Sequence, residues 1–223
     1  MFVKICGITT EEDALLSVAM GADAVGFVMA PSTRQISPTR VGDIVRRLPP
    51  EILTVGVFRD ESPERVVEIV SKSGLRAAQL HGHESVADSV WVGERVPIVI
   101  KAFPAGSREL ERAADYEPDL VLIDAATPGS GEMFDWSLAE DAPRRLPIVM
   151  AGGLTPGNVI EAIAKVHPWG VDVSSGVERS PGRKDPRLVR DFIRAARSAP
   201  TGDWEPVTAP EDLYDWQRDE RGR

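Results

Sequence analysis

The segment Phe2-Val3-Lys4-Ile5-Cys6-Gly7-Ile8-Thr9-Thr10 carries the pattern that decides the fold. Its apolar start predicts a short strand, and Gly7 followed by Thr9-Thr10 predicts a turn into a helix. Similar apolar runs recur every 20 to 30 residues or so, with helical patterns between them. They are near-continuous, which is typical of parallel strands covered on both faces. The runs are Phe2–Cys6, Ala24–Met29, Leu53–Phe58, Ala77–Leu80, Ile98–Phe103, Leu120–Asp124, Ile148–Ala151 and Val171–Ser174.

The segments between these runs have helix signals with a physical cause. A capping oxygen precedes proline at Ser37-Pro38, Ser62-Pro63, Thr155-Pro156 and Asp185-Pro186. Glycines are expected to end helices at Gly21, Gly74 and Gly170. Eight strands alternating with eight helices in about 200 residues predict an α/β fold, a single (β/α)8 TIM barrel. A doubly wound open sheet is the alternative, but no Gly-x-Gly-x-x-Gly follows the first strand.

The barrel is expected to form one catalytic domain over residues 1–198, followed by a short acidic C-terminal extension over residues 199–223. Prolines and a glycine break any helix in this tail, at Pro200, Gly202, Pro206 and Pro210. A disordered, solvated tail is one interpretation. The other is a strap on the barrel or a contact between subunits, which the apolar residues favour: Trp204, Leu213, Tyr214 and Trp216.

Composition excludes several classes of function. Of the 223 residues 42% are hydrophobic, enough for a sizeable core, yet no apolar run approaches the roughly 20 residues that span a bilayer. A formal charge of −9 disfavours nucleic acid and anionic membranes as partners, since both attract clustered Lys and Arg. The single cysteine fits a reducing compartment, and because the N-terminus enters a strand directly we expect no signal peptide. We expect a cytoplasmic monomer or homodimer that binds a small molecule.

The active site of such a barrel lies at the C-terminal ends of the strands. Cys6 ends the first run, and a thiolate there would be a nucleophile or a base, although a lone cysteine is more often a buried hydrophobe. Lys4 lies on the same face of the strand and would favour the thiolate. Asp124 ends the sixth run, and it is either the acid that pairs with this base or a structural residue, a helix cap or a salt-bridged loop aspartate. Arg34, in a polar loop, is the best candidate to bind a carboxylate, a solvated surface residue being the alternative.

The loops after the last two strands predict a phosphate site. Gly152-Gly153 and Ser174-Ser175-Gly176 let backbone N–H groups approach an anion closely, and barrels often hold a phosphate between these two loops. Tight turns alone are the alternative reading of these glycines. We therefore expect a phosphorylated small substrate.

Three other positions carry weaker signals. His81 and His83 follow the fourth run, where His81 could line the pocket, whereas two histidines alone predict no metal site. Lys101 stands where Schiff-base lysines occur, but packing or attraction of phosphate is the more usual role. Asp135-Trp136 is expected to be structural.

These motifs in this order resemble those of phosphoribosylanthranilate isomerase, a family of tryptophan biosynthesis. The resemblance covers about residues 2–197. The motifs are Lys4-Ile5-Cys6-Gly7, Ser32-Thr33-Arg34, Gln79-Leu80-His81-Gly82, Leu122-Ile123-Asp124, Gly129-Ser130-Gly131 with Phe134-Asp135-Trp136, Ala151-Gly152-Gly153-Leu154, and Asp172-Val173-Ser174-Ser175-Gly176-Val177-Glu178. Pro128 and Glu132 depart from the family pattern, in the loop after the sixth strand, and the tail has no counterpart in it.

The resemblance implies an Amadori rearrangement of N-(5-phospho-β-D-ribosyl)anthranilate to 1-(2-carboxyphenylamino)-1-deoxyribulose 5-phosphate. Asp124 would be the general acid and Cys6, as thiolate, the general base. Arg34 would bind the anthranilate carboxylate. The amine of the substrate supplies the electron sink, so no cofactor and no metal are expected. The phosphate would lie on the backbone around Gly153, Ser175 and Gly176.

Three alternatives compete with this reading. The histidine-pathway aminoaldose isomerase, or a bifunctional relative, is expected to have a carboxylate where Cys6 stands and a second phosphate site. A Schiff-base lyase would act through Lys101. A phosphosugar-binding barrel without catalysis would need neither Cys6 nor Asp124.

Overall fold

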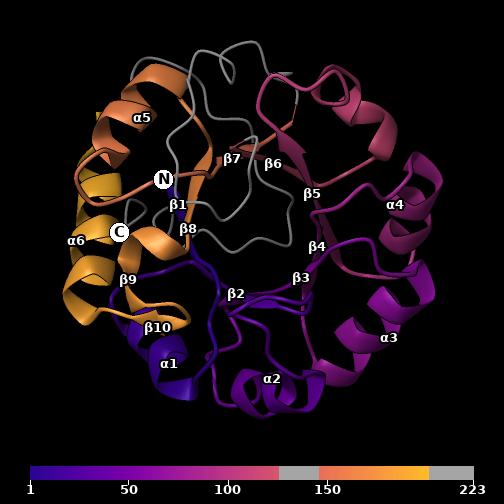
Figure 1. Ribbon diagram of the computed structural model, residues 1–223, viewed down its shortest axis with the longest axis horizontal. Helices are drawn as coiled ribbons and strands as arrows, with labels where there is room; N and C mark the ends of the chain where they lie inside the picture. Colours follow the sequence, from indigo (N-terminus) through magenta and orange to yellow (C-terminus); the bar gives the residue numbers. More distant parts are fainter. Residues whose placement is uncertain (126–145, 201–223) are drawn as a thin grey trace, which may run out of the picture.

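A computed structural model of the protein describes residues 1–125 and 146–200, which form a closed barrel of parallel strands. The strands pair in chain order, and the last closes the ring on the first. Figure 1 shows them as a central ring with the helices around its outside. The barrel strands are β1 (Phe2–Ile5), β2 (Ala24–Val28), β3 (Leu53–Phe58), β4 (Ala77–Leu80), β5 (Ile98–Pro104), β6 (Leu120–Asp124), β7 (Ile148–Met150) and β8 (Gly170–Val173). The predicted (β/α)8 barrel is confirmed.

The described helices are α1 (Glu11–Ala19), α2 (Pro38–Val45), α3 (Pro63–Ser73), α4 (Val86–Gly93), α5 (Val159–Val166) and α6 (Pro186–Ser198). Two 3-10 segments, η1 (Leu110–Tyr116) and η3 (Ser175–Val177), and a hairpin of β9 (Glu178–Ser180) and β10 (Arg183–Lys184) complete the described chain. Three predicted helix starts are confirmed, because Ser37, Ser62 and Asp185 each accept a backbone N–H with proline next in sequence.

One predicted helix start and one predicted helix end are wrong. A helix was expected to start at Thr155-Pro156, but α5 begins at Val159, because the Asn158 side-chain oxygen accepts the Thr155 N–H at 2.7 Å and holds a turn there. Gly170 was expected to end this helix, but it is the first residue of β8. The helix has already ended at Val166, where His167 takes a left-handed conformation with φ 52°. In addition, the segment after β5 is the 3-10 turn η1 rather than an α-helix.

The inside of the barrel is apolar at one end and polar toward the other. Side chains from several strands fill the apolar part, among them Leu53, Ala77, Ile98 and Leu120. Three polar side chains follow on β1, β4 and β8: Lys4, Gln79 and Asp172, all buried. Because inward-facing residues recur every second position of a strand, Lys4 lies directly below Cys6, and Gln79 lies below His81. Lys4 and Gln79 therefore each lie beneath a residue of the C-terminal rim, and Asp172 contacts Lys4.

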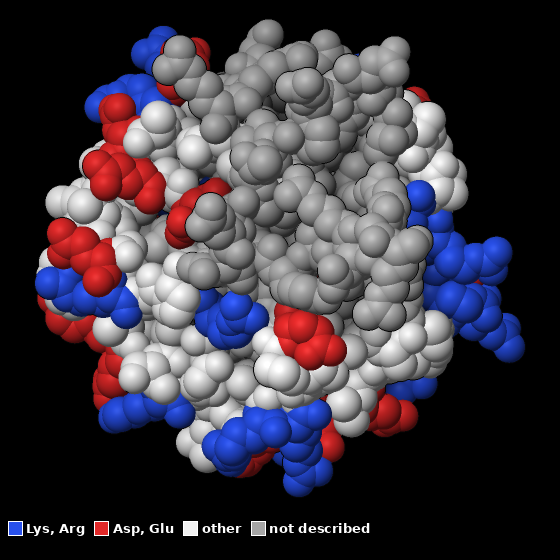
Figure 2. Space-filling view, turned by 180° about the vertical axis from the view of Figure 1, so that it is seen from behind, with Lys and Arg blue, Asp and Glu red and all other residues white. Residues whose placement is uncertain are grey.

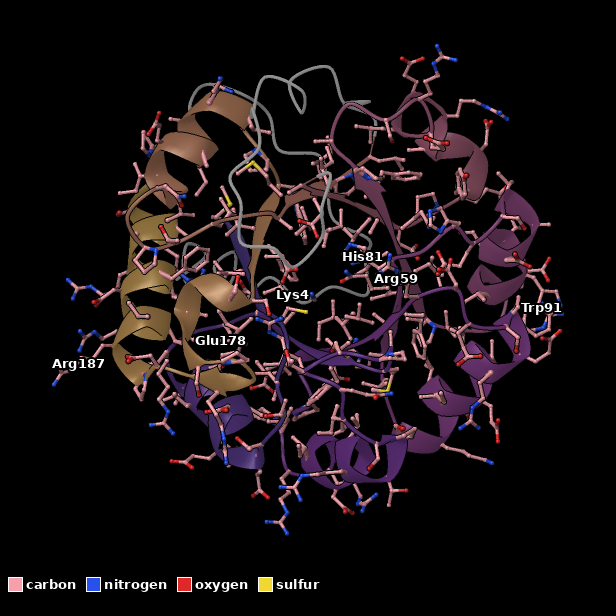
Figure 3. The ribbon with its side chains drawn as sticks, in the orientation of Figure 1. Lys4, Arg59, His81, Trp91, Glu178 and Arg187 are labelled. Atoms are coloured by element: carbon pink, nitrogen blue, oxygen red, sulfur yellow. The ribbon has the colours of Figure 1, made fainter. Side chains whose placement is uncertain are left out.

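The outer surface carries mixed charge. Figure 2 shows a cluster of Lys and Arg at the edge where α6 lies, with other basic groups spread over the rest of this face, and this helix exposes Arg187, Arg190 and Arg194. That edge is outside the barrel, and Figure 3 shows Arg187 pointing away from the ring of strands. Among the described residues, even the longest helices are too short and too polar to cross a membrane.

Candidate active site

The strand ends bring the predicted acid and base to one rim. Cys6 follows β1, His81 follows β4, and Asp124 is the last residue of β6. All three belong to the inward-facing sets of their strands, and Cys6 and Asp124 are each 7% exposed. Figure 3 shows Lys4 and His81 toward the middle of the ring, on opposite sides of it. The site is therefore a buried floor at the C-terminal mouth of the barrel.

Two contacts with described residues hold Asp124 in place. Its Oδ1 accepts the N–H of Ala125 at 2.7 Å, and its Oδ2 lies 3.2 Å from Nε2 of His81. The other ring nitrogen of His81, Nδ1, lies 2.8 Å from Nε2 of Gln79. The carboxyl and the imidazole thus form a connected pair, with the buried amide of Gln79 behind it. His83 takes no part, because its exposed ring contacts Asp60 instead.

The thiol of Cys6 lies above a buried ion pair. Lys4 Nζ is 3.0 Å from Asp172 Oδ1, and both side chains are enclosed. A Cβ on Gly26 of β2 would stand 2.8 Å from the Cys6 Sγ and 3.1 Å from Lys4 Nζ, so only glycine leaves room for this packing. Burial raises the pKa of the Cys6 thiol, Lys4 and Lys184 oppose this rise, and Asp172 adds to it. The net result is a raised pKa, so the thiolate depends on the cations beside it.

Lys4 itself stays charged in this setting. Burial would lower the pKa of the Lys4 ammonium. The interactions of Lys4 with Asp172 and with Cys6 outweigh burial, so the pKa of Lys4 lies above its ordinary value. This agrees with the prediction that Lys4 supports the thiolate. Asp172 is a partner that the sequence analysis did not identify.

Arg34 is already bound within the site. Its Nε and Nη2 donate to the two carboxylate oxygens of Glu178 at 2.9 and 2.8 Å, and Lys184 Nζ donates to the same carboxylate at 3.0 Å. Burial raises the pKa of Glu178, but the hydrogen bonds and charges of Arg34 and Lys184 outweigh it, leaving this pKa below its ordinary value. The hydrogen bonds to Glu178 also raise the pKa of Arg34 above its ordinary value. The pair uses two of the five guanidinium donors and fixes the plane of the group.

The two glycine loops touch, as a shared phosphate site requires. A Cβ on Gly176 would overlap the carbonyl oxygen of Leu154, so only glycine allows the loop after β8 to reach the loop after β7. Asn158 shapes the loop after β7, because its side-chain N–H donates to the Gly153 carbonyl at 3.0 Å. Within the described part of the chain, the N–H groups of Gly153, Ser175 and Gly176 donate to no other residue. Three backbone donors are therefore available to an anion.

Lys101 has a structural environment. Its Nζ donates to the carbonyls of Leu80 and Gly82 at 3.3 and 2.9 Å and to Glu84 at 2.7 Å. Glu84 in turn accepts the N–H groups of Asp60 and Gly82. This enclosed ammonium holds the loop that carries His81, which disfavours a Schiff-base role. No group of three metal-ligating side chains occurs among the residues described.

Comparison with known proteins agrees with this geometry. Residues 3–195 match the family described as N-(5'phosphoribosyl)anthranilate (PRA) isomerase. The chain belongs to this isomerase family. It is 51% identical over 204 residues to the N-(5'-phosphoribosyl)anthranilate isomerase of Desulforudis audaxviator, covering 88% of this chain and 98% of that protein.

Solved structures of the family have the same barrel. The phosphoribosyl anthranilate isomerase of Thermotoga maritima shares 48% identity with a TM-score of 0.81, over 88% of this chain and 98% of that one. A further phosphoribosyl anthranilate isomerase structure, at 45% identity, 88% and 98% coverage and a TM-score of 0.78, contains reduced 1-(o-carboxyphenylamino)-1-deoxyribulose 5-phosphate.

Some predicted features of this isomerase lie outside the described residues. They are the Gly129–Gly131 loop, Phe134-Asp135-Trp136, the departures at Pro128 and Glu132, and most of the tail, residues 201–223. The structure adds five residues that the sequence analysis gave no role of their own: Gln79, Asn158, Asp172, Glu178 and Lys184. Two of the family motifs contain Gln79, Asp172 and Glu178, whereas nothing in the sequence pointed to Lys184.

Proposed function

We propose that Cys6 and Asp124 are the base and the acid of an Amadori rearrangement in this isomerase. The substrate is N-(5-phospho-β-D-ribosyl)anthranilate, and the product is 1-(2-carboxyphenylamino)-1-deoxyribulose 5-phosphate. One observation carries the assignment: a thiol and a carboxyl stand at the same buried rim, each with a second polar side chain beneath or beside it. The relative that contains the reduced product supports the choice of substrate.

The acid step opens the sugar ring. Asp124 transfers a proton to the furanose ring oxygen while the bond from this oxygen to C1′ breaks. The lone pair of the anthranilate nitrogen forms the C1′=N bond, which gives a protonated Schiff base. His81, 3.2 Å from the carboxyl, orients Asp124, and burial keeps water away from the transferred proton.

The base step then forms the enolamine. The Cys6 thiolate removes the proton from C2′, and the electron pair moves into the C1′–C2′ bond while the C=N bond becomes a C–N bond. Tautomerisation of this enolamine, with protonation at C1′ and loss of the hydroxyl proton at C2′, gives the ketone. The ammonium of Lys4 stabilises the thiolate before the transfer.

Substrate binding uses both ends of the molecule. Arg34 retains three N–H donors beside its bonds to Glu178, and these suit the anthranilate carboxylate. The N–H groups of Gly153, Ser175 and Gly176 suit the phosphate. Binding at two ends fixes the sugar between acid and base. In well-oriented systems such positioning lowers the activation barrier by up to about 7–11 kcal/mol.

Assembly and location stay predictions. The Thermotoga maritima relative at 44% identity is described as dimeric, and its structure was also solved in the form of monomers. For this chain, a monomer or a homodimer in the cytoplasm is the expectation, with no nucleic acid and no membrane as partner. Light scattering on the purified protein distinguishes the two assemblies.

The experiment that tests the proposed roles is the loss of substrate fluorescence in a steady-state assay. Wild type should turn over, Asp124→Asn should not while still binding a product analogue, and Cys6→Ser should lose on the order of 10²-fold or more in kcat. His83→Asn is the matched control, since this exposed histidine contacts only the loop at Asp60. Full activity of Cys6→Ala would show that the base is another group.

A further inference from the structure

The amide of Gln79 contains a buried atom without a partner. Its side chain is 1% exposed at the centre of the barrel, and Oε1 has no hydrogen-bond partner in the part of the chain that the structure describes, while Nε2 lies 2.8 Å from Nδ1 of His81. A buried polar atom without a hydrogen bond costs about 1–3 kcal/mol. Turning the amide by 180° would bring Oε1 to His81 and leave Nε2 in the place of Oε1, where it would meet no described partner. Such a cost in the middle of a core requires an explanation.

The two orientations of this amide correspond to two proton counts of the His81–Asp124 pair. With Nε2 of Gln79 donating, Nδ1 of His81 is bare, its Nε2–H donates to Asp124, and Asp124 is a carboxylate. With Oε1 turned toward the ring, Nδ1 carries a proton instead. One further proton is then shared between Nε2 of His81 and Oδ2 of Asp124, which are 3.2 Å apart. The second state contains one proton more than the first.

We propose that Gln79 is a positioning residue that sets the proton on Asp124 through His81. The rotated amide accepts Nδ1–H and stabilises the pair with its extra proton, which is the state able to act as an acid. When Asp124 gives this proton to the ring oxygen of the substrate, Nδ1 of His81 keeps its own proton on Oε1 of Gln79. Asp124 takes up a proton again when the C2′ hydroxyl loses one during tautomerisation, so the rotated amide serves the working acid and the first orientation serves the pair with one proton fewer. This inference rests on the proposed role of Asp124.

Other charged groups near the pair leave this assignment intact. Arg59 follows β3 beside the strand of His81, and Figure 3 shows the two in the same part of the barrel mouth, but the Arg59 side chain is mostly exposed. Asp60 is bound to the backbone of His83, and Glu84 is paired with Lys101. The ion pair of Lys4 lies under Cys6 rather than under His81. Gln79 is the one described side chain in contact with Nδ1.

Nitrogen NMR of the histidines tests the proposal without turnover. The chain has three histidines, so ¹⁵N-histidine labelling gives three ring systems, which His83→Asn and His167→Asn assign. In wild type, Nδ1 of His81 should be bare in the neutral ring and become protonated as the pair takes up a proton. Gln79→Glu offers only acceptors, so Nδ1 should keep its proton throughout. Gln79→Met should release the ring to a mixture of tautomers.

Kinetics then show whether the tautomer matters for the reaction. Gln79→Met should lower kcat by on the order of 10-fold with little change in KM and should shift the acid limb of the pH–rate profile. Thr54→Val is the control, since it removes a buried polar side chain on the neighbouring strand β3 without contact to His81. Equal tautomer signals in wild type and both Gln79 variants would overturn the proposal. So would a neutral wild-type ring with its proton on Nδ1.

These outcomes separate this inference from the proposed function. If Asp124→Asn retained full activity while the NMR followed the expectation, Asp124 would not be the acid but Gln79 would still set the ring of His81. If Asp124→Asn were inactive and Gln79 did not affect the ring, the function would stand and the role of Gln79 would be refuted.

Discussion

Replacing Lys4 by methionine and Asp172 by asparagine should change the ionisation of Cys6 in opposite directions. Lys4→Met removes the nearest cation and leaves less thiolate at a given pH. Asp172→Asn removes an anion that disfavours the thiolate and frees the Lys4 ammonium to act on the sulfur. If Lys4 and Asp172 served only to stabilise the fold, the two substitutions would change the reactivity of Cys6 in the same direction.

The magnitude follows from the packing against Gly26. The Cys6 Sγ and the Lys4 Nζ both lie near the position of a Cβ on Gly26, so these atoms are about 6 Å apart or less. At an effective dielectric constant near 20, two charges at this separation interact by about 3 kcal/mol, which corresponds to roughly a 100-fold change in the thiolate population. A more basic thiolate is also more nucleophilic, so the alkylation rate of Lys4→Met should fall by only about 10-fold. Asp172→Asn should raise it by a few-fold.

Alkylation by iodoacetamide is the assay, because Cys6 is the only cysteine and all label therefore reports on it. Second-order rates are measured against pH. Since burial raises the thiol pKa, the wild-type rate should still be climbing as the pH rises through neutrality. Turnover should follow the same order as the thiolate: Asp172→Asn above Lys4→Met.

Folding is controlled with a third variant. Lys4→Met leaves Asp172 buried without its cation, which risks unfolding, whereas Lys4→Met with Asp172→Asn removes both charges together and is usually tolerated. Its alkylation rate should lie between those of the single variants, and circular dichroism confirms that each variant is folded. Rates that change in the same direction in both folded single variants would refute the reasoning, as would a Lys4→Met rate equal to wild type.

Three further substitutions address the rest of the site. Gly176→Ala places a Cβ on the Leu154 carbonyl, so KM should rise by on the order of 10-fold, and inhibition by inorganic phosphate should weaken in parallel. Arg34→Lys keeps the charge but loses the planar fork, so kcat/KM should fall by on the order of 10-fold in steady-state kinetics, with phosphate inhibition unchanged. Lys101→Met leaves the Glu84 carboxylate buried and unpaired, which should lower the free energy of unfolding in urea by about 3–5 kcal/mol.

The strand ends could be predicted because two local rules locate them. Continuous apolar runs mark parallel strands, and the barrel places whatever follows each run at one rim. Cys6, His81 and Asp124 are therefore found from the sequence as residues that end apolar runs. Topology places His81 and Asp124 at the same rim, on β4 and β6 with β5 between them, but their 3.2 Å contact depends on side-chain placement and was not predicted.

The partners of these residues could not be predicted in the same way. Asp172 meets Lys4 across 168 positions, and Glu178 meets Arg34 across 144, so each pair depends on the closure of β8 onto β1. Lys184 lies on a two-residue strand with no apolar run to mark it. The failed helix start at Thr155-Pro156 has a related cause, because the Asn158 side chain captures the Thr155 N–H and holds a turn.

For the proposed role of Cys6 as the base, the buried polar layer supplies a cation that opposes part of the rise in the thiol pKa caused by burial. Burial alone keeps a thiol protonated, so a thiol in an apolar barrel would be inert at neutral pH. Here the position two residues before Cys6 holds an ammonium, and Asp172 keeps that ammonium charged at 3.0 Å. Replacing such a buried pair by apolar side chains of similar volume is often neutral or stabilising, so stability alone gives little reason to retain it. Its position below Cys6, like that of Gln79 below His81, supports the proposal that the polar layer controls protons at the rim.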